Sequence, residues 1–363
     1  ALAYWEGKFL RMRAPARAIA CQQRAREAWL ADGHLEGQLL AVCAILEAFF
    51  ARWKDWDAAL PWIDEAQRLY QALTAEAGES IGPVGARFAG SDAEYEAIAS
   101  GYGVTLMHPG HPLLAIWYTR ACELLRHASW GEPQLALSSF VMCHAWWHGH
   151  FHTLREVSRQ ALHAIRSGTD RLGVQLTPLL WVVTAGNVDG KACDAERKAA
   201  AGLLVARCER SGIRALRHHA WMRALHGAFT RRDLRSGDLA RARIEALDTN
   251  RPAGRGLTLI SMLAHEQLKG NWPLVIEQSE FLLAHDPAIR DWLFGGHVVR
   301  LGLAQVLAEV GDHERAAYWA RDVLAFARRH DSPGLELLAV LVLAAGEIAR
   351  GRLDQGDDLL RRG

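Results

Sequence analysis

Closely spaced cysteines are missing from this sequence. Its six cysteines stand singly along 363 residues, and no two of them form a Cys-x-x-Cys motif. A disulfide framework is therefore not expected. Scattered thiols of this kind are typical of reduced, packed side chains, so we expect a cytoplasmic protein.

Long apolar runs and an excess of one charge are also missing. No apolar run approaches the ~20 residues that a helix needs to span a bilayer, and the first residues enter an amphipathic helix without a signal peptide. The 42 basic and 41 acidic residues nearly cancel, so the overall field does not favour binding of a polyanion. The sequence predicts neither a membrane partner nor direct contact with nucleic acid.

Signatures of catalysis are absent as well. There is no His-Glu-x-x-His motif, paired-aspartate motif or Gly-x-Gly-x-x-Gly loop. Gly78–Gly82 fits the nucleophile elbow of hydrolases, but an expected helix precedes it where that motif needs a strand. Gly186–Lys191 is one residue too short for a phosphate loop, and Ala192 follows where Ser or Thr would bind magnesium. We therefore expect a binding module that is not an enzyme and holds no cofactor; an all-α enzyme is the least favoured alternative.

Helix-forming residues dominate what is present. Half of the residues are hydrophobic and 23% are charged, as in globular proteins. Ala, Leu, Arg and Glu are abundant, whereas alternating runs of β-branched residues are absent. Glu314–Arg328 shows the helical period, with apolar residues on one face and most arginines on the other. A second helix, over Gly334–Arg350, follows the breaker Asp331-Ser332-Pro333. The fold class predicted is all-α.

A Gly-Asp or Gly-Asn turn, or a close variant, recurs near the C-terminal end. The turn glycines are Gly237, Gly270, Gly311 and Gly351, and the steps between them are 33, 41 and 40 residues. A period of this size is typical of a solenoid whose units are helical hairpins. Each glycine is expected to take the left-handed cap conformation, and the following Asp to cap the next helix. We predict one right-handed superhelical solenoid over residues 1–363, with about eight tetratricopeptide-like hairpins.

The same template predicts the hairpins upstream. The expected helix pairs are Gly37–Arg52 with Trp56–Ala75, Leu135–His148 with Phe151–Ser167, Thr177–Ala185 with Ala192–Ser211, Ala220–Arg235 with Leu239–Leu247, Leu257–Lys269 with Pro273–Ala284, and Val298–Val310 with Glu314–Arg328. The expected irregular segments are Ala77–Ser91 and His108–Pro112. The last repeat stops after one helix, so we expect the chain to be a piece of a longer protein.

Several aromatic-rich segments carry a resemblance to a known family. They are Ala3–Gly7, Trp53–Trp56 with Leu60–Ile63, and His111–Trp117. They resemble the tetratricopeptide-like region of large bacterial regulators related to the maltose-regulon activator, of the signal-transducing ATPase class. The sequence departs from that family's pattern at His111 and His150, where Asp is expected. The resemblance implies a sensor region, with a nucleotide-binding switch domain and a DNA-binding domain elsewhere in the full-length protein.

The resemblance also implies what such a region binds. A repeat array presents a concave groove, which would take a small-molecule inducer or a protein segment. The ligand would bias the ATPase switch through its different affinities for the two states. The alternative is a stand-alone tetratricopeptide adaptor that docks a protein partner. A phosphate loop upstream in the gene favours the regulator, and its absence favours the adaptor.

The predicted helix that ends near residue 148 holds the candidate ligand site. Trp146 and Trp147 are adjacent on a helix and cannot both face the same core, so one is expected to face the groove or a neighbouring helix. Together with His148 they are the predicted ligand-binding residues, since exposed aromatic rings on an inner face anchor apolar or sugar-like ligands. The alternative is that both tryptophans are buried between hairpins.

Two polar features offer further hypotheses. Four histidines lie between His144 and His152, and His144 and His148 share one helix face at a spacing that can chelate a transition metal. No Cys or carboxylate is spaced to complete a tetrahedral site, so surface, cap and packing roles are preferred and no metal is predicted. The arginines between Arg207 and Arg232 are interpreted as a solvated face balanced by Glu196 and Glu209, with anion binding or partner docking as the alternative.

Overall fold

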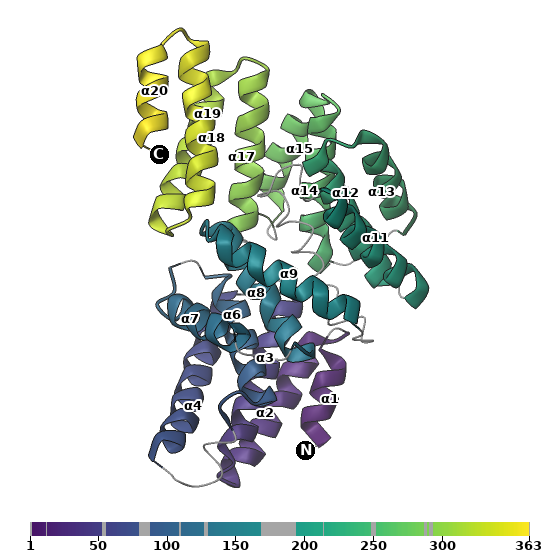
Figure 1. Cartoon of the computed structure of the whole chain (residues 1–363), viewed down its shortest axis with the longest axis vertical. Coiled ribbons are helices and arrows are strands. Elements are labelled where there is room, and N and C mark those ends of the chain that lie inside the picture. Colours follow the sequence, from purple (N-terminus) through teal and green to yellow (C-terminus); the bar gives the residue numbers. More distant parts are fainter. Residues whose placement is uncertain are drawn as a thin grey trace. The chain divides into compact units, whose positions relative to one another are not determined.

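The computed structural model shows an all-helical chain. It describes residues 2–11, 13–52, 56–79, 88–108, 110–126, 130–167, 194–212, 214–247, 252–286, 289 and 293–362. Within these ranges the chain forms 17 α-helices, one short 3-10 helix and no β-strand (Figure 1). The prediction of an all-α fold is confirmed. None of the described helices has an apolar stretch long enough to cross a bilayer.

The described helices follow one another along the chain. In the N-terminal half they are α1 (Leu2–Leu10), α2 (Pro15–Ala31), α3 (Leu35–Arg52), the 3-10 helix η1 (Trp56–Ala59), α4 (Leu60–Glu79), α6 (Asp92–Thr105), α7 (Leu113–Arg126), α8 (Glu132–Trp147) and α9 (Phe151–Ser167). In the C-terminal half they are α11 (Asp194–Ser211), α12 (Arg214–Arg231), α13 (Leu234–Leu247), α14 (Pro252–Leu268), α15 (Trp272–His285), α17 (Leu293–Glu309), α18 (His313–Arg329), α19 (Pro333–Ala349) and α20 (Leu353–Arg362).

Internal contacts divide the chain into two compact units. The first comprises Ala1–Val141 with Ser167–Thr169, and the second comprises Met142–Arg166 with Asp170–Gly363. The boundary falls inside α8, so the last turns of α8 belong to the second unit. The prediction of one continuous array is not tested by this division and stays a prediction.

In the first unit, α3 lies at the centre of the packing. It contacts α2, α4 and α6, while α1 packs on α2 and α7 packs on α6. Leu39, Ile45 and Leu46 of α3 have no exposed surface, and burial of each such side chain stabilises the fold by about 1.5–3 kcal/mol. The α6–α7 contact is so close that a Cβ atom on Gly101 would overlap the ring of Trp117. Glycine is required there because the ring of Trp117 occupies the space that any larger side chain at position 101 would need.

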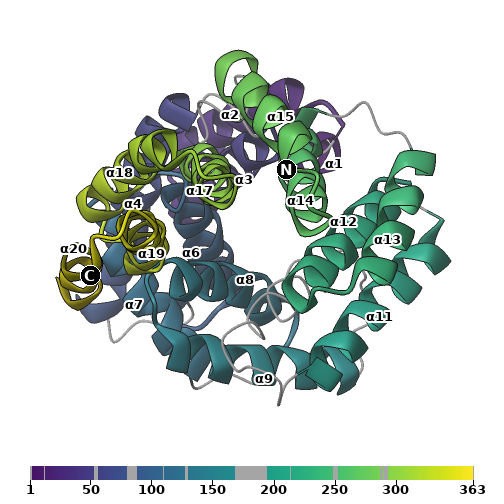
Figure 2. The same ribbon diagram turned by 90° about the horizontal axis from the view of Figure 1, so that it is seen from above.

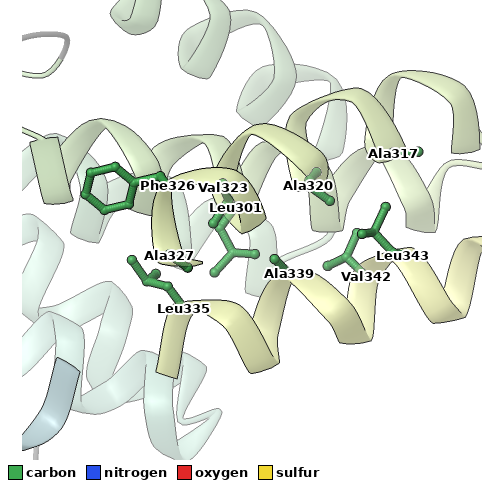
Figure 3. Packing of buried hydrophobic residues seen from close by; sticks show 11 residues of the cluster. Leu301, Ala317, Ala320, Val323, Phe326, Ala327, Leu335, Ala339, Val342 and Leu343 are labelled. Carbon is green, nitrogen blue, oxygen red and sulfur yellow. The ribbon is translucent and has the colours of Figure 1, made fainter. Parts of the chain in front are cut away.

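In the second unit, neighbouring helices pack as successive pairs. α12 contacts α11, α13 and α14, and the side-by-side arrangement of α11, α12 and α13 is visible in both Figure 1 and Figure 2. α17, α18 and α19 share a core in which Val323 and Ala327 of α18 meet Leu335 and Ala339 of α19 (Figure 3). The buried residues of α18 recur every three or four positions, which explains why this segment forms a helix with one apolar face.

The predicted left-handed turns are confirmed at three of the four glycines. Gly270, Gly311 and Gly351 have φ angles of 78°, 85° and 76°. After Gly311, the carboxylate of Asp312 accepts a hydrogen bond from the backbone N–H of Arg315 at 3.2 Å, so it caps α18 as predicted. The turn at Gly311 therefore follows the predicted helix–glycine–cap–helix pattern, whereas Asn271, which follows Gly270, makes no side-chain cap hydrogen bond.

The fourth predicted turn, at Gly237, is wrong. Gly237 lies inside α13, where a Cβ atom would come within 2.3 Å of the buried ring of His265. The turn instead falls at Arg232, which has a φ of 55°, and Asp233 accepts a hydrogen bond from the N–H of Ser236 at 3.0 Å. With the turn at Arg232, the steps to Gly270, Gly311 and Gly351 become 38, 41 and 40 residues. The spacing of these turns is thus more regular than the glycines alone indicate.

Some predicted features lie outside the described residues. They are the turn at Lys54-Asp55, the segment Ser80–Gly82, the helix Thr177–Ala185, and the loop Gly186–Lys191 with Ala192. The remaining predicted helix pairs match observed helices, apart from the Gly237 correction and small differences at their ends.

Candidate functional site

The predicted ligand residues lie at the end of α8 and directly after it. The helix ends at Trp147, and Gly149 turns the chain into α9 with a φ of 72°. The N–H of His150 donates to the carbonyl oxygen of Ala145 at 2.8 Å and closes this end of the helix. The turn therefore fixes the backbone that carries Trp146, Trp147, His148 and His150.

The histidines form a stack. The ring centroids of His144 and His148 are 4.1 Å apart with an interplanar angle of 27°, and His150 lies 5.8 Å from His144. To bind one metal ion, the nitrogen lone pairs of two histidines must point at the same position. Each lone pair lies in the plane of its ring. In stacked rings the two planes are nearly parallel, so the lone pairs do not converge. Among the described residues, no group of three or more His, Cys, Asp or Glu side chains is placed to hold a metal ion.

Burial keeps two of these histidines neutral. It lowers the pKa of His144 to about 2, and the neighbouring His148 and His150 lower it further. Burial also lowers the pKa of His148, although a hydrogen bond from its ring to the backbone carbonyl of Asp331 acts in the opposite direction. A neutral imidazole donates from one nitrogen and accepts at the other. His144 and His148 are thus packed and uncharged at neutral pH.

Trp147 connects the end of α8 to the turn between α18 and α19. Its half-buried ring packs against the core cluster of α17, α18 and α19. Its carbonyl oxygen accepts a hydrogen bond from the hydroxyl of Ser332 at 3.1 Å, across 185 residues of sequence. A Cβ atom on Gly334 would lie 3.3 Å from the same carbonyl oxygen. Trp147 therefore has a packing role, whatever else it binds.

Trp146 has different surroundings from Trp147. Its side chain is half-buried, and it makes no hydrogen bond or ring contact with the part of the chain that the structure describes. Trp147, in contrast, hydrogen-bonds the thiol of Cys143, whose pKa burial raises to about 12. Of the two predicted tryptophans, Trp146 is the one whose indole N–H has no hydrogen-bond partner among the described residues.

The basic stretch lies on α11 and α12, and much of it is paired internally. Arg217 pairs with Glu209 at 2.7 Å, and the indole of Trp221 donates to the same carboxylate at 2.6 Å. Arg207 donates to the carbonyl oxygen of Ile165 at 3.4 Å. The predicted balance by Glu209 is confirmed, while the side chain of Glu196 lies outside the described part of the structure.

Arg223 differs from these arginines. It is enclosed by protein and retains only partial access to solvent. Its Nε is buried, and the side chain has no hydrogen bond or ion pair within the described ranges. Burial lowers the pKa of Arg223 to about 9, and burial together with Arg223 lowers the pKa of His226, one turn later, to about 4. Cys143 of α8 lies within electrostatic reach of Arg223.

Two ionic networks in the first unit were not predicted from the sequence. In one, Lys8 and Arg11 of α1 pair with Glu47 of α3, and Lys8 also pairs with Glu96 of α6. Burial alone would raise the pKa of Glu47, but Lys8 and Arg11 hold it below its usual value. The hydroxyl of Tyr4 donates to Glu96 at 3.4 Å. Two cations thus balance two carboxylates, so the network joins helices and leaves no charge for a ligand.

The second network surrounds Glu94, whose side chain is 1% exposed. Its carboxylate accepts hydrogen bonds from the hydroxyl of Tyr70 at 2.7 Å, from Arg120 at 2.9 Å and from the N–H of Gly90 at 2.6 Å. The sequence does contain a signal for the position of Glu94 at the start of α6, because Ser91-x-x-Glu94 is a capping-box pattern. Both carboxylate oxygens accept hydrogen bonds from within the chain, which indicates a structural role.

Comparisons with known proteins do not assign the chain to a family. A search against models of protein families and a search of curated proteins both ended without a match. The resemblance to the bacterial regulators therefore remains an expectation.

Proposed function

We propose that this chain is a non-catalytic binding region made of tetratricopeptide-like hairpins in a right-handed solenoid. It serves as the cytoplasmic sensor of an ATP-dependent bacterial transcriptional regulator, whose ATPase and DNA-binding domains lie elsewhere in the full-length protein. The nearly constant step of left-handed turns, at Arg232, Gly270, Gly311 and Gly351, supports the repeat. The aromatic segments that resemble the regulator family support the sensor role.

The observation that carries the binding function is the pair of helices α8 and α12. α8 presents Trp146, whose indole N–H has no partner among the described residues, and α12 presents Arg223 and His226 in an enclosed environment with partial solvent access. Aromatic surface together with a few polar donors is the composition typical of small-molecule sites. Trp146, Trp147 and His148 therefore remain the proposed ligand residues, with Trp146 as the direct contact.

A thermal-shift screen with sugars and small organic acids tests this function. Binding to the native state alone raises the unfolding temperature, and the shift should disappear in Trp146→Ala while the helical circular dichroism is retained. Trp5→Ala, at an exposed tryptophan of α1, is the matched control and should keep the shift. A shift that survives both Trp146→Ala and Trp147→Ala would place the ligand elsewhere.

The adaptor remains the second candidate because of one exposed apolar stripe. Leu337, Leu338, Leu341 and Ile348 of α19 are exposed on the side of the helix opposite its buried face. A stripe of this size suits an apolar helix or peptide of a protein partner. The sequence upstream in the gene discriminates between the two candidates, since a phosphate loop there supports the regulator and its absence supports the adaptor.

A further inference from the structure

Among the described residues, no carboxylate pairs with the charge on Arg223. On the same helix, Arg217 pairs with Glu209 and Arg214 donates to the carbonyl oxygen of Leu247. Arg223 has no acceptor of either kind in the described part of the chain, although it is the more enclosed side chain. Removing an ion from water without a partner costs several kcal/mol. A stable fold that retains this cost is typical of a site where an external anion completes the pairing.

The neighbours of Arg223 do not supply that anion. Cys143 of α8 interacts electrostatically with Arg223, but burial raises the pKa of its thiol to about 12, so it is neutral at physiological pH. His226 is neutral as well and carries one N–H that has no acceptor among the described residues. Trp146 follows Cys143 by one turn on the same face of α8, and its indole N–H likewise has no partner among the described residues.

We infer that Arg223 anchors the oxyanion group, a carboxylate or a phosphate, of a small ligand whose apolar body packs against Trp146. Guanidinium donates two parallel hydrogen bonds to such groups, which fixes their orientation as well as their charge. The imidazole of His226 supplies an additional uncharged donor next to the guanidinium. This inference rests on the proposed binding function and adds the chemical class of the ligand.

Titration with defined anions tests the assignment. The probes are benzoate, inorganic phosphate and neutral benzamide, added at constant ionic strength so that screening of surface charges does not change. Benzoate or phosphate should raise the unfolding temperature of the wild-type chain in a saturable manner, and benzamide should not. A response to phosphate alone identifies a phosphate ligand, and a response to benzoate alone identifies a carboxylate on an apolar body.

Two variants of α12 separate the site from general effects. Arg223→Met should abolish the anion-dependent shift and, without anions, should unfold at the same temperature as the wild type or higher, because an apolar side chain of similar length removes the cost of the unpaired charge. Arg217→Met removes a paired arginine of the same helix and should keep the anion response. Arg223→Lys keeps the charge without the planar fork and should retain a weakened response.

The outcomes also distinguish this inference from the proposed function. The anion site is overturned if neither anion stabilises the wild type, or if Arg223→Met responds to anions as the wild type does. A neutral ligand whose stabilisation depends on Trp146 but not on Arg223 would likewise overturn the anion site, and would leave the binding function in place. The anion site and the binding function are both supported if Trp146→Ala and Arg223→Met each lose every ligand response while Arg217→Met keeps it.

Discussion

At the scale of single residues, Gly311 shows how backbone geometry selects an amino acid. Its φ of 85° lies in the left-handed region, and a Cβ atom there would meet no neighbouring atom. Substitution at this position is therefore limited by backbone conformation alone. The turn pattern in the sequence was sufficient to predict it, because glycine is the residue that adopts this conformation without cost.

Gly311→Val is expected to lower the free energy of unfolding by roughly 1–2 kcal/mol, because a β-branched residue is strained in the left-handed region. Urea unfolding measures the change. Gly302→Ala is the matched control, since Gly302 lies within helix α17 in open space and the substitution should stabilise by about 0.5–1 kcal/mol. Equal stability of Gly311→Val and the wild type would show that this turn does not constrain the fold.

Glu94 is a buried charge whose only cation in the described structure is Arg120. Arg120→Ala leaves the carboxylate buried without a counterion, so a loss of about 3 kcal/mol or more is expected. Arg328→Ala removes an arginine from the exposed pair with Glu336 and should cost less than about 1 kcal/mol. Unfolding curves that rank the two variants in the opposite order would contradict the structural role of Glu94.

His144 is expected to make the fold sensitive to acid. Its folded pKa is about 2 because of burial, whereas the unfolded chain has the ordinary value of about 6.5. Below pH 6.5 the unfolded state binds a proton that the folded state does not, so stability falls as the pH falls. The loss between pH 7 and pH 5 should be about 2 kcal/mol, and His144→Gln should reduce it. The same pH dependence in both proteins would show that other groups cause it.

At the scale of secondary-structure elements, local patterns were predictable and contacts between distant segments were not. The glycine turns and helical periods are read from neighbouring residues. The turn at Arg232 carries no such signal, because arginine takes the left-handed conformation only where the surrounding structure imposes it. The pairing of Lys8 with Glu96 and the isolation of Arg223 depend on helices far apart in sequence. The sequence offered anion binding only as an alternative for all the arginines between Arg207 and Arg232, and no local pattern singled out Arg223.

Gly237 illustrates the same limit, since the sequence indicated a turn and the structure uses the glycine for packing. Gly237→Ala should destabilise by about 1–3 kcal/mol despite the better helix propensity of Ala, because the methyl group would displace the buried ring of His265. Gly202→Ala in α11, where a Cβ atom meets nothing, should stabilise instead. Thermal unfolding that shows a gain for both variants would mean that α13 and α14 can separate without cost.

At the scale of the whole molecule, charge is balanced both in composition and locally. The chain has 42 basic and 41 acidic residues. Even in its most basic helices, Arg217 is neutralised by Glu209 and Arg207 and Arg214 donate to backbone carbonyl oxygens. Binding to duplex DNA depends on cations that replace the counterions of several phosphates at once. One enclosed guanidinium at Arg223 suits a small anion better than a polymer.

We therefore predict that the isolated chain neither binds duplex DNA specifically nor hydrolyses ATP. Fluorescence anisotropy at physiological salt should show no sequence-selective complex with a Kd on the order of 10⁻⁸ M or tighter, and phosphate release from ATP should match the buffer blank. The most direct check of the ATPase prediction is Lys191→Ala, because Lys191 occupies the lysine position of the imperfect phosphate loop. Hydrolysis that this substitution removes would make the non-catalytic assignment wrong. Weak DNA binding that falls equally for all DNA sequences as the salt concentration rises would be non-specific electrostatic attraction. Such binding is compatible with a binding region that acts through other domains.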